Sequence, residues 1–453
     1  MRKKIVFLGI FILFSFAAVF ILVKKNSFQV EELFAKKIPD EVKLLREYRI
    51  PEAMAVKFGD VNGDGKMGFA VFTKDYSVYV YDFYGKELWH YQAPAADSYL
   101  RAPFEPPGVI WDFDQDGYAE VAHWRMIKGK EWLVIADGKT GAIKHEVQWP
   151  TTPLPHFYNN FRLAVAKLHP GYPDSLIVLT DSGKTISINA YNAELKLLWS
   201  HIENRLKDSL GHYLYPVDIN GDGLDEIVVS NLVLDSSGKV IWNNFGIFPN
   251  NRDHVDSFRL TDFDGDRELE LLAAQSDVGT VVYKALTGKV LWKRASRHTQ
   301  NIEFGKFLAN IPEPQIIATS RTYKYRNSGQ PFLYGQTYWF SSKGELISKW
   351  PDKPLNCNPI FVKGDWRGNG KEELFWYKFH MNSAGKGEFF FKEGVYQMFE
   401  FIGNGTEQVI TLTLGGRLLR VYGFRYASPA KSKVRANRGI DYLKNRVANH
   451  SYY

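Results

Sequence analysis

Short apolar stretches alternate with loops of Gly, Asp and Asn along most of this chain, without the 3.6-residue spacing of amphipathic helices. The recurring unit is an apolar strand, a short polar loop and a second strand. Clear copies occupy residues 54–72, 109–124, 214–230 and 258–274, and degenerate copies occupy residues 162–179, 302–319, 361–377 and 398–414. The pattern therefore predicts eight related units built from β-strands.

A second signature follows most copies, a turn that leads into a strand ending in Trp. It occurs at residues 85–89, 194–199, 238–242, 288–292 and 344–350. The loops of successive copies lie about 49 residues apart, a period typical of β-propeller blades with about four strands each. We therefore predict an all-β protein in which residues 48–430 form one β-propeller, with eight blades favoured over seven. Seven blades remain the alternative because the last two loops, which open at residues 365 and 400, are only 35 residues apart.

The amino terminus carries a long apolar run. Ile5 to Val23 are 19 consecutive uncharged residues, about 28 Å long as a helix, which is enough to cross a bilayer core. Basic residues before the run predict that the rest of the chain faces outward. We predict a signal anchor or transmembrane helix over residues 1–25 and a membrane-anchored, extracytoplasmic protein, with a cleaved signal peptide as the alternative. Residues 26–47 then form a charged, partly helical spacer, and residues 431–453 form a tail associated with the closing blade.

Composition and charge narrow the classes of function. The 45% hydrophobic and 24% charged residues are ordinary for a globular protein, and the 32 Phe, 25 Tyr and 12 Trp favour strands and carbohydrate-stacking surfaces. Residues 1–25 account for +5 of the net charge of +7, so the remainder gives no reason to expect nucleic acid as a partner. The single cysteine, Cys357, excludes an intrachain disulfide and a Cys-rich zinc site.

Three of the polar loops carry a carboxylate or amide side chain at positions 1, 3, 5 and 9. Oxygen ligands at this spacing suit Ca²⁺ and resemble half of an EF-hand loop. The alternative is that the loops are ordinary Asp/Gly hairpin turns. We predict Ca²⁺ as a structural cofactor that ties each loop to the strand after it. The predicted ligands are Asp112, Asp114, Asp116 and Glu120; Asp218, Asn220, Asp222 and Glu226; and Asp262, Asp264, Asp266 and Glu270.

Two further loops depart from this pattern. The loop that opens at Asp60 has Gly68 where the closing acid should be. The loop that opens at Asp365 has Arg367 at the third position, where a cation repels a metal ion. We predict that these two loops are weak or vacant calcium sites.

Three histidines fall at similar offsets before consecutive loops. His212 and His254 lie six and eight residues before the acidic loops of their units, and His298 lies eight residues before the equivalent position of the next unit. The segment that leads into the innermost strand of a blade lies on the face around the central channel, so we expect one funnel to hold all three. Alone, each is more often an ordinary histidine. Nearby candidates for charge neutralisation and proton donation are Arg162, Arg252, Asp256, Arg321 and Tyr323.

Over residues 54–414 the sequence resembles the rhamnogalacturonan lyases, a family built on an eight-bladed propeller with calcium loops. The motifs that carry the resemblance are GHYLYPVDINGDGLDEIVVSNLVLDSSG (211–238), DHVDSFRLTDFDGDRELELL (253–272) and TGKVLW (287–292). The His-Gly-Asp-Ala stretch of that family appears here as His254, Val255, Asp256 and Ser257, with two of the four residues changed.

The resemblance implies β-elimination on a uronate-containing polysaccharide such as rhamnogalacturonan. A base removes the proton at C5, beside a carboxylate whose charge calcium or arginine must neutralise first. On this hypothesis His254 or His212 is the base. Arg162 or Arg321 is the carboxylate clamp, and Tyr323 is the candidate acid.

Two competing hypotheses keep the fold without the chemistry. One is a calcium-stabilised propeller of the integrin-like FG-GAP type, tethered to the membrane, that binds a glycan or a protein partner at the cell envelope. The other is a scaffold subunit of an envelope assembly. Propellers host many functions, so the fold by itself does not separate these hypotheses from a lyase.

Overall fold

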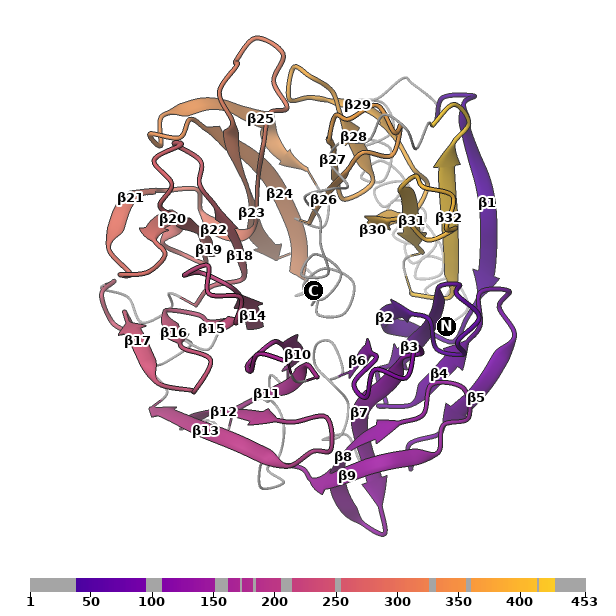
Figure 1. Ribbon diagram of the computed structural model, residues 1–453. Helices are drawn as coiled ribbons and strands as arrows, with labels where there is room; N and C mark the ends of the chain where they lie inside the picture. Colours follow the sequence, from indigo (N-terminus) through magenta and orange to yellow (C-terminus); the bar gives the residue numbers. More distant parts are fainter. Residues whose placement is uncertain are drawn as a thin grey trace, which may run out of the picture.

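A computed structural model describes residues 38–94, 108–150, 162–171, 173–181, 185–204, 214–248, 254–325, 331–355, 360–413 and 415–427. For residues 181, 322–325, 331–334 and 353–355 it describes the backbone alone. These residues form eight four-stranded antiparallel sheets, arranged as the blades of a ring around a central channel (Figure 1). The prediction of an all-β propeller with eight blades is therefore confirmed.

The first four blades each take four consecutive strands, and the first strand of each is the innermost (Figure 1). Blade 1 contains β2 (Ala53–Gly59), β3 (Gly68–Thr73), β4 (Val78–Tyr81) and β5 (Glu87–Tyr91). Blade 2 contains β6 (Gly108–Trp111), β7 (Glu120–Ile127), β8 (Lys130–Ala136) and β9 (Ile143–Gln148). Blade 3 contains β10 (Arg162–Ala166), β11 (Ser175–Asp181), β12 (Thr185–Tyr191) and β13 (Leu197–Asn204). Blade 4 contains β14 (Leu214–Val217), β15 (Glu226–Val229), β16 (Leu232–Leu234) and β17 (Val240–Asn243).

The next three blades follow the same order. Blade 5 contains β18 (Ser257–Thr261), β19 (Glu270–Gln275), β20 (Gly279–Lys284) and β21 (Val290–Arg294). Blade 6 contains β22 (His298–Gly305), β23 (Gln315–Tyr325), β24 (Pro331–Phe340) and β25 (Leu346–Leu355). Blade 7 contains β26 (Phe361–Gly364), β27 (Glu373–Trp376), β28 (Phe379–Met381) and β29 (Gly387–Phe390). Its strands have only three or four residues, which accounts for the short last spacing between loops.

Blade 8 closes the ring with strands from both ends of the domain. It contains β30 (Gly394–Phe399), β31 (Gln408–Leu412), β32 (Leu418–Phe424) and, outermost, β1 (Val42–Arg49). β1 pairs antiparallel with β32 from Val42 opposite Phe424 to Arg49 opposite Leu418. Residues 42–47, which the sequence analysis assigned to the spacer, thus belong to the propeller. They cover an edge of β32 that would otherwise expose unpaired backbone groups.

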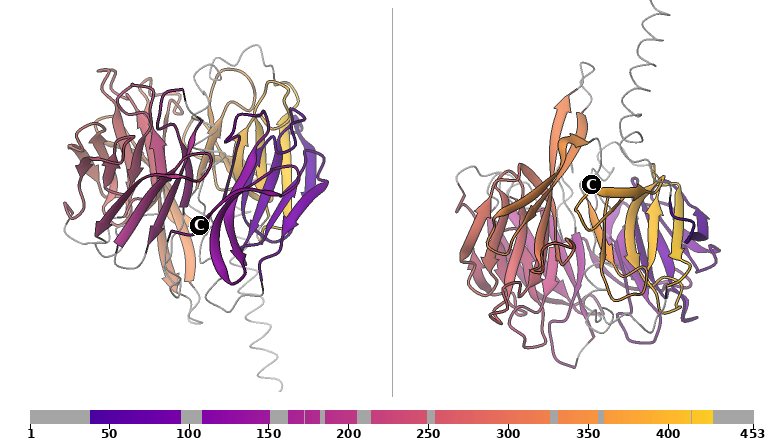
Figure 2. Two further views of the ribbon diagram at one scale, coloured as in Figure 1. Left: turned by 60° about the horizontal axis from the view of Figure 1, so that its bottom comes forward. Right: turned by 90° about the horizontal axis from the view of Figure 1, so that it is seen from above.

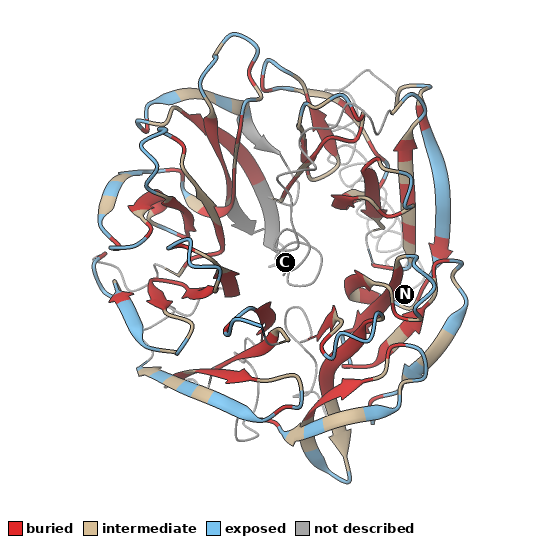
Figure 3. Ribbon diagram, viewed as in Figure 1, coloured by how far each residue is buried: buried red, intermediate tan, exposed pale blue. Residues whose placement is uncertain are grey.

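The core lies between neighbouring blades. Strands near the channel are buried, whereas the outermost strands carry exposed and half-buried residues (Figure 3). Between blades 2 and 3, for example, Val109 and Ala122 pack with Leu163 and Val165, each at most 6% exposed. Both faces of each sheet are thus covered by neighbouring blades. For this reason the inner strands have nearly continuous apolar runs.

A Trp within the outermost strand of several blades fastens each of those blades to the next. In blade 4, Trp242 donates from Nε1 to the backbone oxygen of Ala285 in blade 5 at 2.8 Å. Gly288 lies against the indole at φ +67°, where an added Cβ would come within 2.6 Å of the ring. The same hydrogen bond joins Trp89 to Gly138, Trp199 to Ser236 and Trp292 to Ser342. The Gly-Lys-x-x-Trp signature therefore interlocks neighbouring blades. Its Gly leaves room for the Trp of the preceding blade, and its own Trp hydrogen-bonds to the backbone of the following blade.

His123 in β7 is fully buried and held neutral. Its Nδ1 lies 2.9 Å from the backbone oxygen of Trp124 and carries the proton, while Arg125 donates from Nε to His123 Nε2 at 3.1 Å. Burial, and after it the charge of Arg125, lower the pKa of His123 well below its usual range. The folded protein therefore disfavours the imidazolium form at this position.

We expect His123 to make the protein acid-sensitive. The unfolded chain protonates this histidine near pH ~6.5 but the folded chain does not, so its contribution to stability is complete above that pH and declines below it. Urea unfolding between pH 7 and pH 5 measures how steeply the free energy of unfolding falls as the pH is lowered. We expect this fall to be less steep in the His123→Gln variant than in the original chain, by up to about 1.4 kcal/mol per pH unit. His90→Gln, at an exposed position, is the control. Equal slopes in His123→Gln and the original chain would contradict this assignment.

Two predicted segments lie outside the described residues. They are the anchor over residues 1–25 with most of the spacer, and the tail over residues 431–453. Within the part of the chain that the structure does describe, no helix is long and apolar enough to span a bilayer.

Candidate active site

Two of the three predicted histidines meet at the boundary between blades 5 and 6. His254 precedes the innermost strand β18, and His298 opens the innermost strand β22. Their ring centroids lie 5.8 Å apart, with an interplanar angle of 67°. The third, His212, lies outside the described residues. We call the group formed by His254, His298 and the side chains around them the histidine site.

A buried carboxylate lies between the two imidazoles. Asp256 Oδ1 is 3.4 Å from His254 Nε2, and Asp256 Oδ2 is 4.0 Å from His298 Nε2. The Asp256 side chain is fully buried, and the amide of Gln300 donates to its Oδ2. A carboxylate held in this way orients His254 and stabilises the imidazolium that forms when it accepts a proton.

The hydrogen bonds of His298 assign its tautomer and tie Arg321 to the site. Nδ1 is 2.6 Å from Asp277 Oδ1 and 3.2 Å from Ser276 Oγ, so the ring proton lies on this nitrogen. Arg321 donates from Nη2 to Nε2 at 3.1 Å, which requires a lone pair there. His298 is therefore a neutral acceptor that positions the guanidinium, and its register partner in the sheet is Arg321 itself.

Burial lowers the pKa of His298 from its usual value. The charge of Asp256 opposes that effect, and the charge of Arg321 adds to it. The lowered pKa agrees with the neutral tautomer that the hydrogen bonds assign. Between the two histidines, His254 is consequently the better candidate for proton abstraction.

The donor atoms of His254, Asp256 and His298 lie within 4.8 Å of one another, a set that suits a divalent cation. Arg321, however, already donates to His298 Nε2. A cation at that nitrogen would sit beside a guanidinium, and the repulsion disfavours it. The arrangement therefore suits a site in which the arginine supplies the positive charge.

The remaining predicted residues lie at different distances from the histidine site. Arg162 is buried at the start of β10 in blade 3, two blades from His254. Tyr323 follows Arg321 by two residues in β23, opposite Leu333, and the structure describes only its backbone. Arg252 lies outside the described residues. The roles of Arg162 and Tyr323 stay predictions.

A long hairpin rises beside the histidine site. β23 and β24 have 11 and 10 residues, and their pairing continues to Tyr325 opposite Pro331. The two strands project beyond one face of the ring (Figure 2). Because His298 pairs with Arg321 at the channel end of this hairpin, the projecting arm stands on the same face as the histidine site.

The acidic loops lie at the other end of the innermost strands. His254 precedes β18 and Asp262 follows it, and a strand of five residues spans about 17 Å. A calcium ion in these loops is therefore too far away to neutralise a substrate at the histidine site. Of the two charge sources that the sequence analysis considered, arginine is the one that this geometry supports.

The closing acid of each full acidic loop binds the backbone of its own loop. Glu120, Glu226 and Glu270 accept hydrogen bonds from the N–H groups of Phe113, Ile219 and Phe263 at 2.8, 2.7 and 3.3 Å. These hydrogen bonds tie the start of the following strand to the loop. That a calcium ion adds to this tie stays a prediction.

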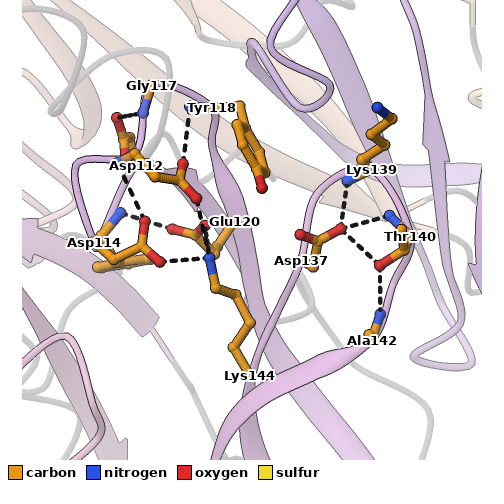
Figure 4. Close-up of polar contacts among 12 residues, drawn as sticks. Asp112, Asp114, Gly117, Tyr118, Glu120, Asp137, Lys139, Thr140, Ala142 and Lys144 are labelled. Atoms are coloured by element: carbon orange, nitrogen blue, oxygen red, sulfur yellow. Dashed lines mark hydrogen bonds and ion pairs between the residues drawn. The ribbon is translucent and has the colours of Figure 1, made fainter.

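The full loops differ in what faces their carboxylates. In blade 4, the amide of Asn220 donates to Asp222 and Glu226. Burial, and then the charges of Asp222 and Asp218, raise the pKa of Glu226 to about 7. The oxygen donors of this loop are of the type that Ca²⁺ takes. Among the full loops of the described residues, however, those that bring three carboxylates within 4.8 Å of one another are in blades 2 and 5, with Asp112, Asp114 and Glu120, and with Asp262, Asp264 and Glu270. In blades 2 and 5, a lysine lies among the carboxylates instead (Figure 4).

Comparison with known proteins places these features in context. No family model matches the sequence. The chain is 24% identical over 295 residues to the rhamnogalacturonan endolyase YesW of Bacillus subtilis (strain 168), a match that covers 52% of this chain and 46% of that protein. It is 24% identical over 376 residues to the rhamnogalacturonan exolyase YesX of the same organism, covering 68% of this chain and 57% of that protein. The chain thus spans about half the length of these curated relatives.

The solved structures that resemble this fold include rhamnogalacturonan lyases as well. The exotype rhamnogalacturonan lyase YesX superposes with a TM-score of 0.61 at 18% identity, covering 86% of this chain and 77% of that one. YesW superposes with a TM-score of 0.62 at 19% identity, covering 82% and 71%. This chain is therefore similar in sequence and in fold to rhamnogalacturonan lyases. The resemblance that its motifs predicted is therefore confirmed.

The propeller alone does not select a function for this lyase-like chain. The V. cholerae biofilm matrix protein Bap1 superposes with a TM-score of 0.56 at 13% identity, covering 86% of this chain and 92% of that one. The function therefore has to be argued from the histidine site.

Several residues of the histidine site carried no signal in the sequence. Asp277 and Ser276 lie in a turn of blade 5 and reach His298 only because an isolated bridge joins Ser276 to Thr299 in blade 6. Gln300 reaches Asp256 from the neighbouring blade. Such contacts arise where blades meet, and a repeat pattern within one blade does not contain them.

Proposed function

We propose that this protein is a membrane-anchored, extracytoplasmic lyase that cleaves a uronate-containing polysaccharide such as rhamnogalacturonan by β-elimination. The observation that carries the proposal is the histidine site, where Asp256 orients His254 beside the Arg321–His298 pair. The likeness to rhamnogalacturonan lyases supports the substrate class. The apolar run at the amino terminus supports the anchor and the outward-facing propeller.

His254 would remove the C5 proton of the uronate. The C–H electron pair then forms the double bond between C4 and C5 as the C4–O bond breaks, and the leaving oxygen takes a proton. Asp256, whose side chain is fully buried beside His254, stabilises the imidazolium that this step creates. The step needs no external oxidant, reductant or added water.

Arg321 would neutralise the carboxylate next to C5. Without that positive charge, proton removal builds a second negative charge on the same sugar. A guanidinium matches a carboxylate with two parallel hydrogen bonds, and its contact with His298 holds it in place. Tyr323, two residues further along β23, is the candidate that returns a proton to the leaving oxygen.

Calcium is proposed as a structural cofactor of the propeller, outside the reaction. The loop of blade 4 has the donor set that fits it, with Asp218, Asp222 and Glu226 as carboxylate ligands. Because these residues lie at the far end of the innermost strand, chelation would affect stability more than the chemical step. The proposed location outside the cytoplasm is also one where a polysaccharide can reach the protein.

The proposal is tested with the full chain, purified in a mild detergent and incubated with rhamnogalacturonan, homogalacturonan and other uronate polymers. The ultraviolet absorbance of the unsaturated uronate reports elimination directly. We expect a signal on at least one polymer. Folded protein that binds a polymer but releases no unsaturated product would favour a tethered glycan-binding propeller instead.

Arg321→Met is expected to lower kcat/KM on the acidic polymer by about 10²- to 10³-fold, because the substrate carboxylate loses its counter-charge. The same polymer with its carboxylates methyl-esterified carries no charge to neutralise. We therefore expect the variant to lose much less activity on the ester. An equal loss on both substrates would contradict the role of Arg321 as the carboxylate clamp.

A further inference from the structure

In blade 2, a lysine of the protein lies where a calcium ion would sit. Lys144 Nζ is 2.5 Å from Asp114 Oδ2, 2.9 Å from Glu120 Oε1 and 3.4 Å from Asp116 Oδ2. Figure 4 shows the amine pointing into the loop between Asp114 and Glu120. Three of the four predicted calcium ligands therefore share this one ammonium group.

Blade 5 has the same arrangement with a different lysine. Lys284 Nζ is 2.8 Å from Asp266 Oδ2, 2.9 Å from Glu270 Oε1 and 3.1 Å from Glu268 Oε2. In both loops, the ammonium therefore contacts the closing acid, whose side chain is at most 1% exposed.

The two lysines come from different places in their blades. Lys144 lies in the fourth strand, β9, whereas Lys284 ends the third strand, β20. A residue inherited with the repeat would occupy the same position in both blades. What the two blades share is the place that the ammonium group reaches, beside the buried closing acid, Glu120 or Glu270. This indicates that each of these buried carboxylates requires a cation.

In other blades, protein side chains also hold the loop, although these loops lack the set of acidic residues that would bind a metal. In blade 7, Arg367 Nε lies 2.9 Å from Glu373 Oε1, the acid at the closing position. In blades 6 and 8, Gln315 and Gln408 take the closing position and accept hydrogen bonds from two loop N–H groups each. These loops hold their shape through side chains of the protein.

We propose that Lys144 and Lys284 replace calcium ions in the loops of blades 2 and 5, so that these two loops are metal-independent. Calcium needs six to eight oxygen ligands, and an ammonium on the closing acid blocks that shell and repels the ion. Calcium binding would require the lysine to leave a buried carboxylate. The inference concerns stability alone and is independent of the proposed lyase activity.

The experiment is a calcium titration of the full chain in detergent, by calorimetry and by melting temperature with calcium or with a chelator. The variants are Lys144→Met and Lys284→Met, with Lys289→Met as a matched control on an exposed turn of blade 5. We expect each lysine variant to bind one more calcium ion per chain than the original chain. The affinity of the altered loop for calcium is expected to be at least about tenfold higher in the variant than in the original chain. Each variant is also expected to melt lower in chelator and to recover with calcium.

A separate variant covers the case in which a lysine variant fails to fold. Glu226→Gln leaves both lysines in place and alters only the loop of blade 4. If blades 2 and 5 are metal-independent, Glu226→Gln abolishes tight calcium binding by the chain. Two calcium ions retained by Glu226→Gln, or lysine variants with the calcium response of Lys289→Met, would overturn the proposal.

Discussion

Substitution of His254 by Ala is expected to lower kcat by about 10²- to 10⁴-fold on whichever uronate polymer the original chain cleaves. On the proposed mechanism the imidazole takes the C5 proton, and Asp256 beside it cannot substitute because its side chain is fully buried. Binding of the polymer is expected to change little, since the proton transfer occurs only in the chemical step. Initial rates across substrate concentration separate the two quantities.

The control for this variant is His90→Ala. His90 lies on the outermost strand of blade 1, where its side chain is 51% exposed and contacts Glu87. Its removal should leave both kcat and KM unchanged. A His254→Ala variant that folds and keeps full turnover would remove His254 as the base and leave His212, which stands two residues before β14 in the sequence.

Substitution of Trp242 by Ala is expected to lower the free energy of unfolding by about 3–5 kcal/mol. The indole is 7% exposed, lies 5.8 Å from the Tyr283 ring and donates to Ala285 in the next blade. Its loss opens a cavity and leaves a carbonyl without its donor. Urea unfolding followed by tryptophan fluorescence and by circular dichroism measures the change.

Two further variants divide this effect into its parts. Trp242→Phe keeps a ring in the cavity but removes the N–H donor, and is expected to cost about 1–3 kcal/mol. Ile241→Ala, at a position that is 37% exposed on the same strand, is expected to change stability by about 0.5 kcal/mol or less. A Trp242→Ala variant as stable as Ile241→Ala would show that the interlock between blades does not support the ring.

The fold was predictable because the sequence repeats its physical requirements. Each blade needs apolar strands and turns that tolerate positive φ, four blades add an interlocking Trp, and these features recur with one period. The closing strand escaped prediction because β1 is unlike the repeat: it pairs with β32 from the opposite end of the domain. Its edge position leaves most of its side chains exposed, so its apolar pattern is weak.

The histidine site was predictable only in part. The equal offsets placed His254 and His298 together, and their rings do lie side by side. Arg321 was a candidate from the sequence, but its contact with His298 was not predicted. Asp277 carried no signal because it reaches His298 from a turn of the neighbouring blade. Likewise, the ligand spacing of the acidic loops drew attention to calcium, whereas Lys144 and Lys284 follow the loops by more than ten residues and show no motif.

On the proposed function, the chain breaks its polymer by elimination at the histidine site. The most direct measurement is mass spectrometry of the products formed in heavy-oxygen water by the original chain and by His254→Ala. We predict unsaturated uronate ends without heavy oxygen from the original chain, and almost none from the variant. Saturated products that carry heavy oxygen would identify a hydrolase, and an uncleaved polymer in every case would identify a binding propeller; either result contradicts the account.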